Sequence, residues 1–407
     1  MGLYYGIDNK IVIVMVGLPA RGKSYTSNNL SRYLSWSGYK CQVFNSGKLR
    51  RNLYPEYNKA SFFNPKNKEH NHILENISIK CFESMLEWLI NGGQIGIFDA
   101  TNSTILRRYN LKKILKSKNI VCSLIFIEIL CNNTDLIHSN ILMKKFSDDY
   151  KDMTRLEAIN DFKMRLKYYQ SKYESITDGE NINYIKLNKG ENSLYINNVY
   201  GIIEGQITSY LQNLKIKKHP IYITRHGESI YNTENRLGGD SELTDKGKLY
   251  ADNLYEYITS QVNEDNLTIF TSCLKRTKMT GIHFKKTIES NLLNELNAGI
   301  CENLTYSEVE EKYNKLSESR EKNKLIFRYP EGESYLDILE KLKLFILNLE
   351  CIDTPILIIS HRAVIRVLLA YFLNYPLAEM PHKEISLNRV IKLNPTSDKY
   401  NVDTITL

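Results

Sequence analysis

The stretch that decides the fold of the first half of the chain reads Gly17-Leu18-Pro19-Ala20-Arg21-Gly22-Lys23-Ser24. It matches the pattern G-x-x-x-x-G-K-[ST] at every fixed position, and it lies between the apolar residues 11–16 and the helically spaced residues 23–36. The two glycines let successive backbone N–H groups face one anion, and the following helix adds the positive end of its dipole. The stretch therefore predicts a nucleotide site in which Lys23 contacts the β- and γ-phosphates and Ser24 places its hydroxyl on Mg²⁺.

A carboxylate ends a later apolar run, where a site of this kind needs one. Asp99 directly follows residues 95–98, which have the composition of a buried strand. A carboxylate there can hold Mg²⁺ through water or accept a proton from an attacking hydroxyl, and helix capping is its alternative role. The chain contains no N-K-x-D signature for guanine, so ATP is the expected nucleotide.

The pattern around these motifs predicts a parallel α/β sheet, because strands alternate with helices. The predicted strands of the first half are residues 11–16, 41–44, 94–98, 121–129 and 184–187. The predicted helices are residues 23–36, 73–89, 104–116, 134–146, 154–172 and 198–214. Residues 50–68 hold two prolines and many polar side chains, and we expect them to be irregular.

A short basic segment at residues 215–220, closed by Pro220, marks the predicted domain boundary. We therefore expect one domain over residues 1–216 and a second over residues 217–407. Beyond the boundary the alternation starts again, which predicts a second α/β domain. Its predicted strands are residues 221–224, 268–272 and 356–359. Three helices are predicted: one begins after Thr244, one begins after Leu274, and one spans residues 363–373.

Two histidines follow predicted strands of the second domain. His226 stands between Arg225 and Gly227 after one strand, and His361 follows another. A neutral imidazole beside an arginine suits a nucleophile that accepts a phosphoryl group, and ligands gather at the carboxyl ends of parallel strands. Arg276 adds a cation after a third strand and Glu295 is a candidate proton donor, so a shared anion pocket without a metal is expected. The alternative is a structural histidine at a strand end.

Composition limits the class of protein. The chain has 407 residues, of which 42% are hydrophobic and 25% charged, and this profile excludes collagen-like, coiled-coil and wholly disordered proteins. Its net charge of +8 is spread along the sequence, which suits anionic small molecules and shows no basic stripe for nucleic acid. The 7 cysteines form no C-x-x-C pair, which favours a reducing, cytoplasmic location. No apolar run approaches the roughly 20 residues that span a bilayer, so no membrane contact is expected.

Taken together in this order, the motifs resemble the bifunctional family of 6-phosphofructo-2-kinase/fructose-2,6-bisphosphatases. The likeness rests on residues 17–24, on F-D-A-T-N at 98–102, on R-H-G-E-S at 225–229 and on G-E-S-Y at 332–335. It implies a P-loop NTPase-like parallel sheet with helices on both faces, followed by a phosphoglycerate-mutase-like α/β domain. It also implies fructose 6-phosphate and fructose 2,6-bisphosphate as substrates, ATP and Mg²⁺ for the kinase, no cofactor for the phosphatase, and a homodimer.

The resemblance also implies roles for residues of the kinase domain. The catalytic residues would be Asp99, Lys23 and Cys131, with a buried hydrophobic thiol as the alternative role for Cys131. Mg²⁺ would lie on Ser24 and Asp99. The nucleotide-binding residues would be Gly17, Leu18, Pro19, Ala20, Arg21, Gly22, Lys23, Ser24, Asn140 and Lys145. The residues that bind fructose 6-phosphate would be Arg50, Thr101, Arg107, Lys145, Arg165 and Tyr169.

For the phosphatase domain, the resemblance implies His226 as nucleophile, Glu295 as acid and base, and His361 as the partner that stabilises the transferring phosphoryl group. The substrate-binding residues would be Arg225, Asn232, Gly238, Arg276, Tyr306, Arg320, Lys324, Tyr335, Arg362 and Arg366.

Three positions depart from the family pattern. Leu49 stands where the family has tyrosine, Leu74 lies near the place of a sugar-binding arginine, and Arg362 replaces a glutamine. Loss of one phosphate-binding cation weakens sugar binding by about 1–3 kcal/mol if nothing compensates. An added cation at Arg362 either strengthens ground-state binding or hinders turnover. These departures leave open a bisphosphatase with a weakened kinase domain; an ATP sensor without transfer and a nucleic-acid end-processing enzyme are further alternatives.

Overall fold

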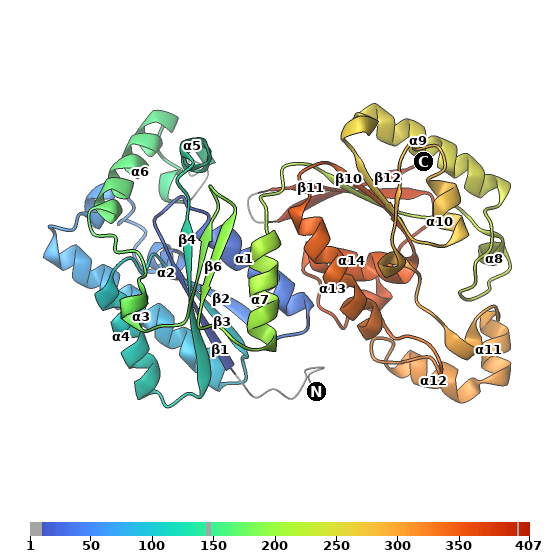
Figure 1. The fold of residues 1–407 in the computed structure, drawn as a ribbon, viewed down its shortest axis with the longest axis horizontal. Coiled ribbons are helices and arrows are strands. Elements are labelled where there is room, and N and C mark those ends of the chain that lie inside the picture. Colours follow the sequence, from blue (N-terminus) through green and yellow to red (C-terminus); the bar gives the residue numbers. More distant parts are fainter. Residues whose placement is uncertain (1–9, 144–147, 397–398) are drawn as a thin grey trace. The chain divides into compact units, whose positions relative to one another are not determined.

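A computed structural model of the chain describes residues 10–143, 148–396 and 399–407 (Figure 1). Internal contacts divide the chain into two compact units, Met1–Gln212 and Asn213–Leu407. Each unit contains one six-stranded sheet. The division lies four residues before the predicted boundary at residue 216, and the exact boundary stays a prediction.

The sheet of the first unit has the strand order β2-β3-β1-β4-β5-β6. Its strands are β1 (Lys10–Val16), β2 (Cys41–Asn45), β3 (Ile95–Asp99), β4 (Cys122–Leu130), β5 (Tyr184–Asn188) and β6 (Ser193–Asn197). All neighbours are parallel except β5 and β6, which form a hairpin. This confirms the predicted parallel α/β sheet, whereas β6 was not predicted because its exposed edge position requires no continuous apolar run.

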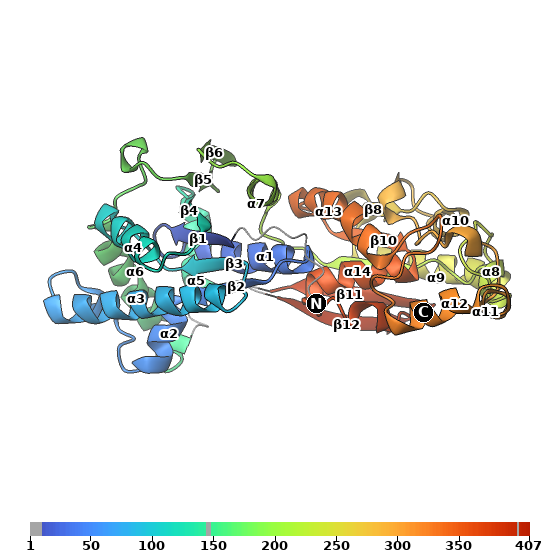
Figure 2. The same ribbon diagram turned by 90° about the horizontal axis from the view of Figure 1, so that it is seen from below.

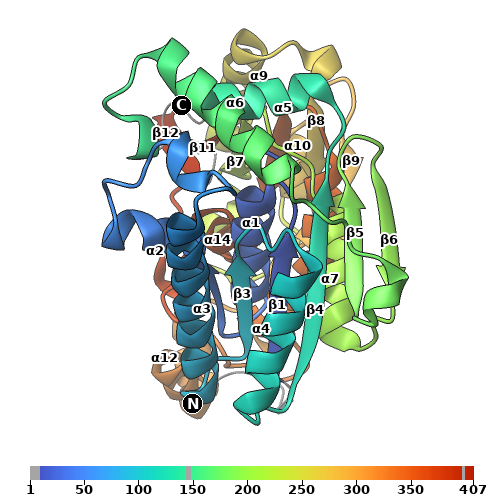
Figure 3. The ribbon, with the colours of Figure 1, turned by 90° about the vertical axis from the view of Figure 1, so that its left-hand side faces the viewer.

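Helices cover both faces of this sheet. The helices are α1 (Lys23–Trp36), α2 (Ser46–Leu53), α3 (Lys68–Ile90), α4 (Ile105–Ser117), α5 (Thr134–Met143), α6 (Arg155–Gln170) and α7 (Ile202–Asn213). Helices α3 and α4 pack on the side of β1 that carries Val12, Val14 and Val16 (Figure 3). Because successive strand side chains point to opposite faces, the remaining β1 residues face the side of α1 and α7, whose Tyr33 and Tyr210 rings stack at 4.4 Å.

One prediction in this unit was wrong in part. Residues 50–68 were expected to be irregular, but α2 extends into them and a 3₁₀ helix covers Ala60–Phe63. Asn45 starts α2, because its side-chain oxygen accepts a hydrogen bond from the Lys48 backbone N–H at 2.7 Å. Asn45, Ser46 and Gly47 are residues typical of turns, so the sequence pattern did not predict a helix that begins here. The predicted helix over residues 134–146 begins as expected, and its last residues lie outside the described part of the chain.

The sheet of the second unit has the strand order β12-β11-β7-β10-β8-β9. Its strands are β7 (Ile221–Arg225), β8 (Thr268–Thr271), β9 (Ile288–Glu289), β10 (Ile356–Ser360), β11 (Arg389–Pro395) and β12 (Tyr400–Thr406). Strands β7 to β10 are parallel, and β11 and β12 are antiparallel and lie side by side in Figure 2. The last two were not predicted, because their alternating polar residues resemble a loop.

The helices of the second unit are α8 (Ile230–Thr233), α9 (Asp245–Gln261), α10 (Lys275–Thr280), α11 (Tyr306–Lys312), α12 (Asn314–Lys322), α13 (Tyr335–Cys351) and α14 (Arg362–Leu373). Helices α11 to α13 were not predicted. Parallel strands bring their carboxyl ends to one sheet edge, and here Ser360 pairs with Arg225 while Ile359 pairs with Thr271. The segments after these strands therefore meet. No helix in the described part of the chain is long and apolar enough to cross a membrane.

Candidate active sites

In the first unit, residues 17–24 curl tightly between β1 and α1. Gly17 has φ +135° and Gly22 has φ +89°, values that L side chains rarely adopt. A Cβ atom on Gly17 would lie 2.6 Å from the carbonyl oxygen of Ile129. Lys23 Nζ donates to the Leu18 carbonyl at 2.8 Å, which folds the lysine back over the loop. The backbone thus has the concave shape that receives phosphate at a helix N-terminus.

Asp99 lies beside this loop and is held in place. It is the last residue of β3, is 3% exposed, and accepts a hydrogen bond from the Asn45 side-chain amide. Two residues later, the Thr101 carbonyl accepts a hydrogen bond from Gly17 N–H at 3.0 Å. This contact ties the segment after β3 to the start of the loop. Asn45 was not predicted as a site residue; its register opposite Asp99 is visible only in the sheet.

Three more predicted residues of the kinase site lie in or near the loop: the nucleotide-binding residues Asn140 and Arg21 and the catalytic candidate Cys131. Asn140 Nδ2 donates to the Ala20 carbonyl at 3.0 Å. Arg21 is buried, burial lowers its pKa, and its Nη1 has no hydrogen-bond partner among the described residues. Cys131 is buried just after β4. The predicted residue Lys145 lies outside the described residues.

Predicted sugar-binding residues meet at a second cluster in this unit. Arg50 is 2% exposed and pairs with the buried carboxylate of Asp149, which also accepts from Arg165 Nη1 at 3.2 Å. The Arg165 guanidinium lies 3.7 Å from the Phe63 ring centroid, and the Tyr169 ring lies 5.9 Å from the same ring. The cluster thus contains two arginines beside the Phe63 and Tyr169 rings, an arrangement that suits a sugar phosphate. Asp149 and Phe63 were not predicted.

Arg107 stands apart from this cluster. Its guanidinium contacts Glu75 and Ser78 on α3. Lys172 lies between the arginine cluster and Arg107. Its Nζ is 5.6 Å from the Tyr169 ring centroid of the cluster. Burial, and then the charge of Arg107, lower the pKa of Lys172. Lys172 is therefore a further cation of this region that sequence reasoning missed.

In the second unit, the two predicted histidines lie side by side. The His226 and His361 ring centroids are 5.2 Å apart, and both residues are buried. His226 Nδ1 lies 2.7 Å from the Gly227 carbonyl, which can only accept, so Nδ1 carries the proton. In the neutral ring Nε2 then keeps its lone pair and is the nucleophilic atom. Burial, followed by the charges of Arg276 and Arg225, holds the pKa of His226 well below its usual range.

Two arginines lie beside the histidine pair, and Glu295 is a carboxylate whose charge acts on both of them. Arg225 Nη1 donates to the Ile385 carbonyl at 2.8 Å, and Arg276 Nη1 donates to the Gly239 carbonyl at 2.7 Å. Burial and then Arg362 lower the pKa of Arg225 to about 10. Among the described residues, the hydrogen-bond partners of Arg225 and Arg276 are backbone carbonyls and not carboxylates, so both charges can pair with an anionic ligand.

A second group of predicted cations lies close by. Arg366 Nη1 donates to the Tyr335 hydroxyl at 2.8 Å, and the Arg320 guanidinium lies 5.8 Å from the Tyr306 ring centroid. Burial, and then Arg366, Arg320 and Arg362, lower the pKa of Lys324 to about 8. Arg362 affects both Arg225 and Lys324, and therefore lies near both groups of cations.

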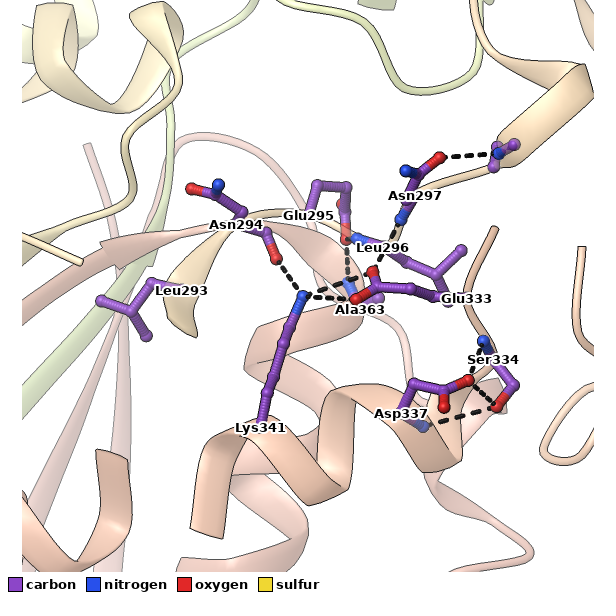
Figure 4. A network of polar contacts seen from close by, with 12 residues as sticks. Leu293, Asn294, Glu295, Leu296, Asn297, Glu333, Ser334, Asp337, Lys341 and Ala363 are labelled. Atoms are coloured by element: carbon purple, nitrogen blue, oxygen red, sulfur yellow. Dashed lines mark hydrogen bonds and ion pairs between the residues drawn. The ribbon is translucent and has the colours of Figure 1, made fainter. Parts of the chain in front are cut away.

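Glu295 lies in the loop before η7 (Gly299–Cys301), beside Ala363 at the start of α14 (Figure 4), and its charge acts on Arg225. Its Oε1 accepts from Leu296 N–H at 2.9 Å and from Ala363 N–H, at the start of α14, at 3.3 Å. Lys341 and Glu333 hold the same loop: Lys341 Nζ contacts the Asn294 carbonyl at 3.1 Å and Glu333 at 3.3 Å. A cavity of about 760 Å³ is lined by Glu295, Arg276, Glu333 and Lys341, among others.

We expect Glu333→Gln to lower the turnover of the phosphatase site about 10-fold with little change in KM, because misplacement of a catalytic group by a fraction of an ångström is costly. The variant weakens the Lys341 contact that steadies the Glu295 loop. Steady-state kinetics check this result. Glu340→Gln is the matched control, since the ion pair of Glu340 with Lys343 lies within α13. An unchanged kcat in Glu333→Gln contradicts the positioning role.

The two remaining predicted residues, Asn232 and Gly238, lie in loops of this site. Asn232 Oδ1 accepts from Ser229 N–H at 3.1 Å, which leaves its amide hydrogens for a ligand. Gly238 has φ +60°, and a Cβ atom there would lie 2.0 Å from Glu302. Glu302 bonds to the N–H groups of Gly239 and Ala298 and so braces the carbonyl that holds Arg276. Glu302 was not predicted, since nothing in its neighbourhood in the sequence indicates this contact.

Comparison with known proteins agrees with two different sites in one chain. The 6-phosphofructo-2-kinase family matches residues 4–218, and branch 1 of the histidine phosphatase superfamily matches residues 221–407. A 6-phosphofructo-2-kinase/fructose-2,6-bisphosphatase from Arabidopsis thaliana is 41% identical over 393 residues, which cover 95% of this chain and 52% of that protein. This chain thus spans about half the length of the plant relative.

A second relative, 6-phosphofructo-2-kinase/fructose-2,6-bisphosphatase 3 from Rattus norvegicus, is 38% identical over 406 residues, which cover 98% of this chain and 72% of that protein. Among solved structures, the alpha-ribazole phosphatase from Shigella flexneri is 19% identical, covers 46% of this chain and 96% of that chain, and has a TM-score of 0.40.

Proposed function

Because this chain belongs to the 6-phosphofructo-2-kinase/fructose-2,6-bisphosphatase family, we propose that it makes and degrades fructose 2,6-bisphosphate. The first unit transfers the γ-phosphoryl group of ATP to the 2-hydroxyl of fructose 6-phosphate. The second unit hydrolyses the same 2-phosphate. The observation that supports this most strongly is the presence of two unlike anion sites, a phosphate-binding loop in one sheet and a buried histidine pair among arginines in the other.

In the kinase site, the N–H groups of residues 17–24 bind the triphosphate and Lys23 offsets its charge. Asp99, steadied by Asn45, accepts the proton of the attacking 2-hydroxyl or holds the metal. Ser24 is exposed and Asp99 ends its strand, so both offer the hard oxygen ligands that Mg²⁺ prefers. Mg²⁺ bound there would neutralise charge on the phosphate oxygens.

The sugar is placed by the arginine cluster of the same unit. We assign its 6-phosphate to Arg50 and Arg165, whose positions are set by Asp149, and its ring to the neighbourhood of Tyr169. Arg107 and Lys172 extend this positive region. Lys172 then supplies a cation in the part of the site where Leu74 departs from the family pattern. The roles of Thr101, Cys131 and Lys145 stay predictions.

In the phosphatase site, His226 Nε2 attacks the phosphorus of the 2-phosphate. The bond from phosphorus to the sugar O2 breaks, and protonated Glu295 gives its proton to that oxygen. Water then attacks the phosphohistidine and loses a proton to Glu295, which frees phosphate and restores His226. Arg225, Arg276 and His361 bind the phosphoryl oxygens throughout.

The 6-phosphate of the bisphosphate is bound by the second group of cations, Arg320, Lys324 and Arg366, with Tyr306 and Tyr335 beside them. Gly238 lines the same cavity as Glu295 and Arg276, and Asn232 stays a predicted substrate-binding residue. Arg362 lies near both phosphate positions, and we assign it to ground-state binding of the bisphosphate.

Lys324 makes this binding dependent on pH. Its ammonium binds the 6-phosphate, and with a pKa of about 8 it is charged below pH 8 and loses the proton as pH rises through that value. We expect KM for fructose 2,6-bisphosphate to rise above pH 8, by about tenfold for the loss of one charge-assisted contact. Lys324→Arg stays charged, so its KM should be flat over the same range. A rise of equal size in both proteins contradicts the assignment.

An assay of both directions on one preparation tests the proposed function. Fructose 6-phosphate with ATP and Mg²⁺ should give ADP and a product that the same protein slowly hydrolyses to phosphate. Hydrolysis without synthesis indicates an essentially monofunctional bisphosphatase. ATP binding without sugar-dependent ADP release indicates a sensor, and ADP release only with 5′-hydroxyl oligonucleotides indicates a nucleic-acid enzyme.

We also propose a cytoplasmic homodimer. The location is supported by the seven cysteines, all of which are free thiols in the structure. The dimer is supported by the family resemblance, and light scattering on the purified chain tests it.

A further inference from the structure

Lys189 carries a buried charge that none of the roles above uses. It follows β5 in the turn to β6, and its backbone N–H donates to the Leu130 carbonyl at 2.9 Å. Its Nζ is buried and has no hydrogen-bond partner in the described part of the chain. A buried ammonium without an anion or an acceptor is costly, so its presence requires an explanation.

The ammonium lies directly against the phosphate-binding loop. A Cβ atom built on Gly22 would lie 3.2 Å from Lys189 Nζ, so the ammonium lies next to Gly22, the residue that caps the start of α1. The ring centroid of Tyr25, in the first turn of that helix, lies 5.1 Å from Nζ. This cation–π contact offsets part of the desolvation. The ammonium nevertheless keeps all its hydrogen-bond donors unused.

The charged groups around Lys189 favour an external anion as its partner. Burial lowers the pKa of Lys189 to about 8, and the Cys131 thiol is the group that opposes this shift. Arg21, in the loop itself, also has a buried Nη1 without a partner among the described residues. Two unsatisfied cations flank a backbone that already presents its N–H groups to an anion. A phosphate chain satisfies all of these donors together.

We propose that Lys189 is a further nucleotide-binding residue, whose ammonium pairs with a phosphate oxygen of ATP held by residues 17–24. The inference rests on the proposed kinase function, because it takes ATP as the ligand of this loop. The pattern N-K-G at residues 188–190 does not identify such a role by itself. The position of Lys189 at the carboxyl end of a parallel strand agrees with it.

The test is calorimetric titration of the full chain with ATP and excess Mg²⁺ at pH 7, combined with thermal unfolding with and without that ligand. We expect Lys189→Met to bind ATP about 10- to 100-fold more weakly, since a charge-assisted contact is lost. Its unliganded form should unfold at the same or a higher temperature than the wild type, because an unpaired buried charge is removed. Lys189→Arg should stay within about threefold of wild-type affinity, because it keeps the charge.

Lys118→Met is the matched control, since Lys118 is exposed at the end of α4, and it should change neither property. Equal ATP affinity in wild type and Lys189→Met overturns the inference while the kinase proposal stands. Weaker ATP binding together with a lower unfolding temperature of the unliganded variant also overturns it, because the lysine is then structural. A wild-type protein that binds no ATP overturns both proposals.

Discussion

Replacement of His226 by alanine is expected to abolish hydrolysis of fructose 2,6-bisphosphate, with kcat reduced by more than about 10⁴-fold. The reason is the loss of His226 Nε2, which we propose accepts the phosphoryl group and whose lone pair is left free by the Nδ1 contact to Gly227. Synthesis of the bisphosphate should continue at the wild-type rate, because the loop of residues 17–24 belongs to the other unit.

The measurement is steady-state hydrolysis together with rapid-quench labelling by the 2-³²P-labelled bisphosphate. Wild type should retain an acid-labile, base-stable label on His226, and His226→Ala should retain none. His382→Ala removes an exposed histidine of the same unit and should behave like wild type. Label retained by His226→Ala, or a kcat within tenfold of wild type, would show that another group receives the phosphoryl.

Replacement of Lys23 by methionine is expected to lower the kinase rate by about 10³-fold while hydrolysis is unchanged. We propose that Lys23 pairs with the β- and γ-phosphates of ATP, and the 2.8 Å hydrogen bond to the Leu18 carbonyl holds its side chain over the loop. Methionine keeps the length and the apolar stem of the side chain, so the variant tests the charge rather than the packing.

Sugar-dependent ADP release measures the effect, and bisphosphatase activity of the same sample shows that the chain is folded. Lys118→Met serves again as the control on an exposed position. If Lys23→Met lost both activities in parallel, the assignment of separate sites would be wrong. If it kept full kinase activity, the loop would not be the phosphate site.

Much of the architecture was predictable because short stretches of sequence indicate buried strands and tight turns. Fully buried strands such as β1 and β10 read as unbroken apolar runs, and the glycines of residues 17–24 mark a backbone shape that few other residues adopt. These signals predicted two α/β units and their family, and both predictions are confirmed. Edge strands and short polar helices were missed. Strand β12 and helix α12 are stabilised by one neighbour and by solvent rather than by a continuous apolar face.

The sequence by itself determined which chemical groups are present and roughly where each strand ends: a phosphate-binding loop, a carboxylate at Asp99, and histidines at 226 and 361. Only the tertiary structure decided what surrounds them. Asn45 reaches Asp99, Lys189 reaches Gly22, and Glu333 with Lys341 holds the Glu295 loop, each across a gap in the sequence that no local pattern spans. The physical reason is that burial and charge compensation act through space, so the same lysine or glutamate becomes a surface residue or part of a site according to which strand end it meets.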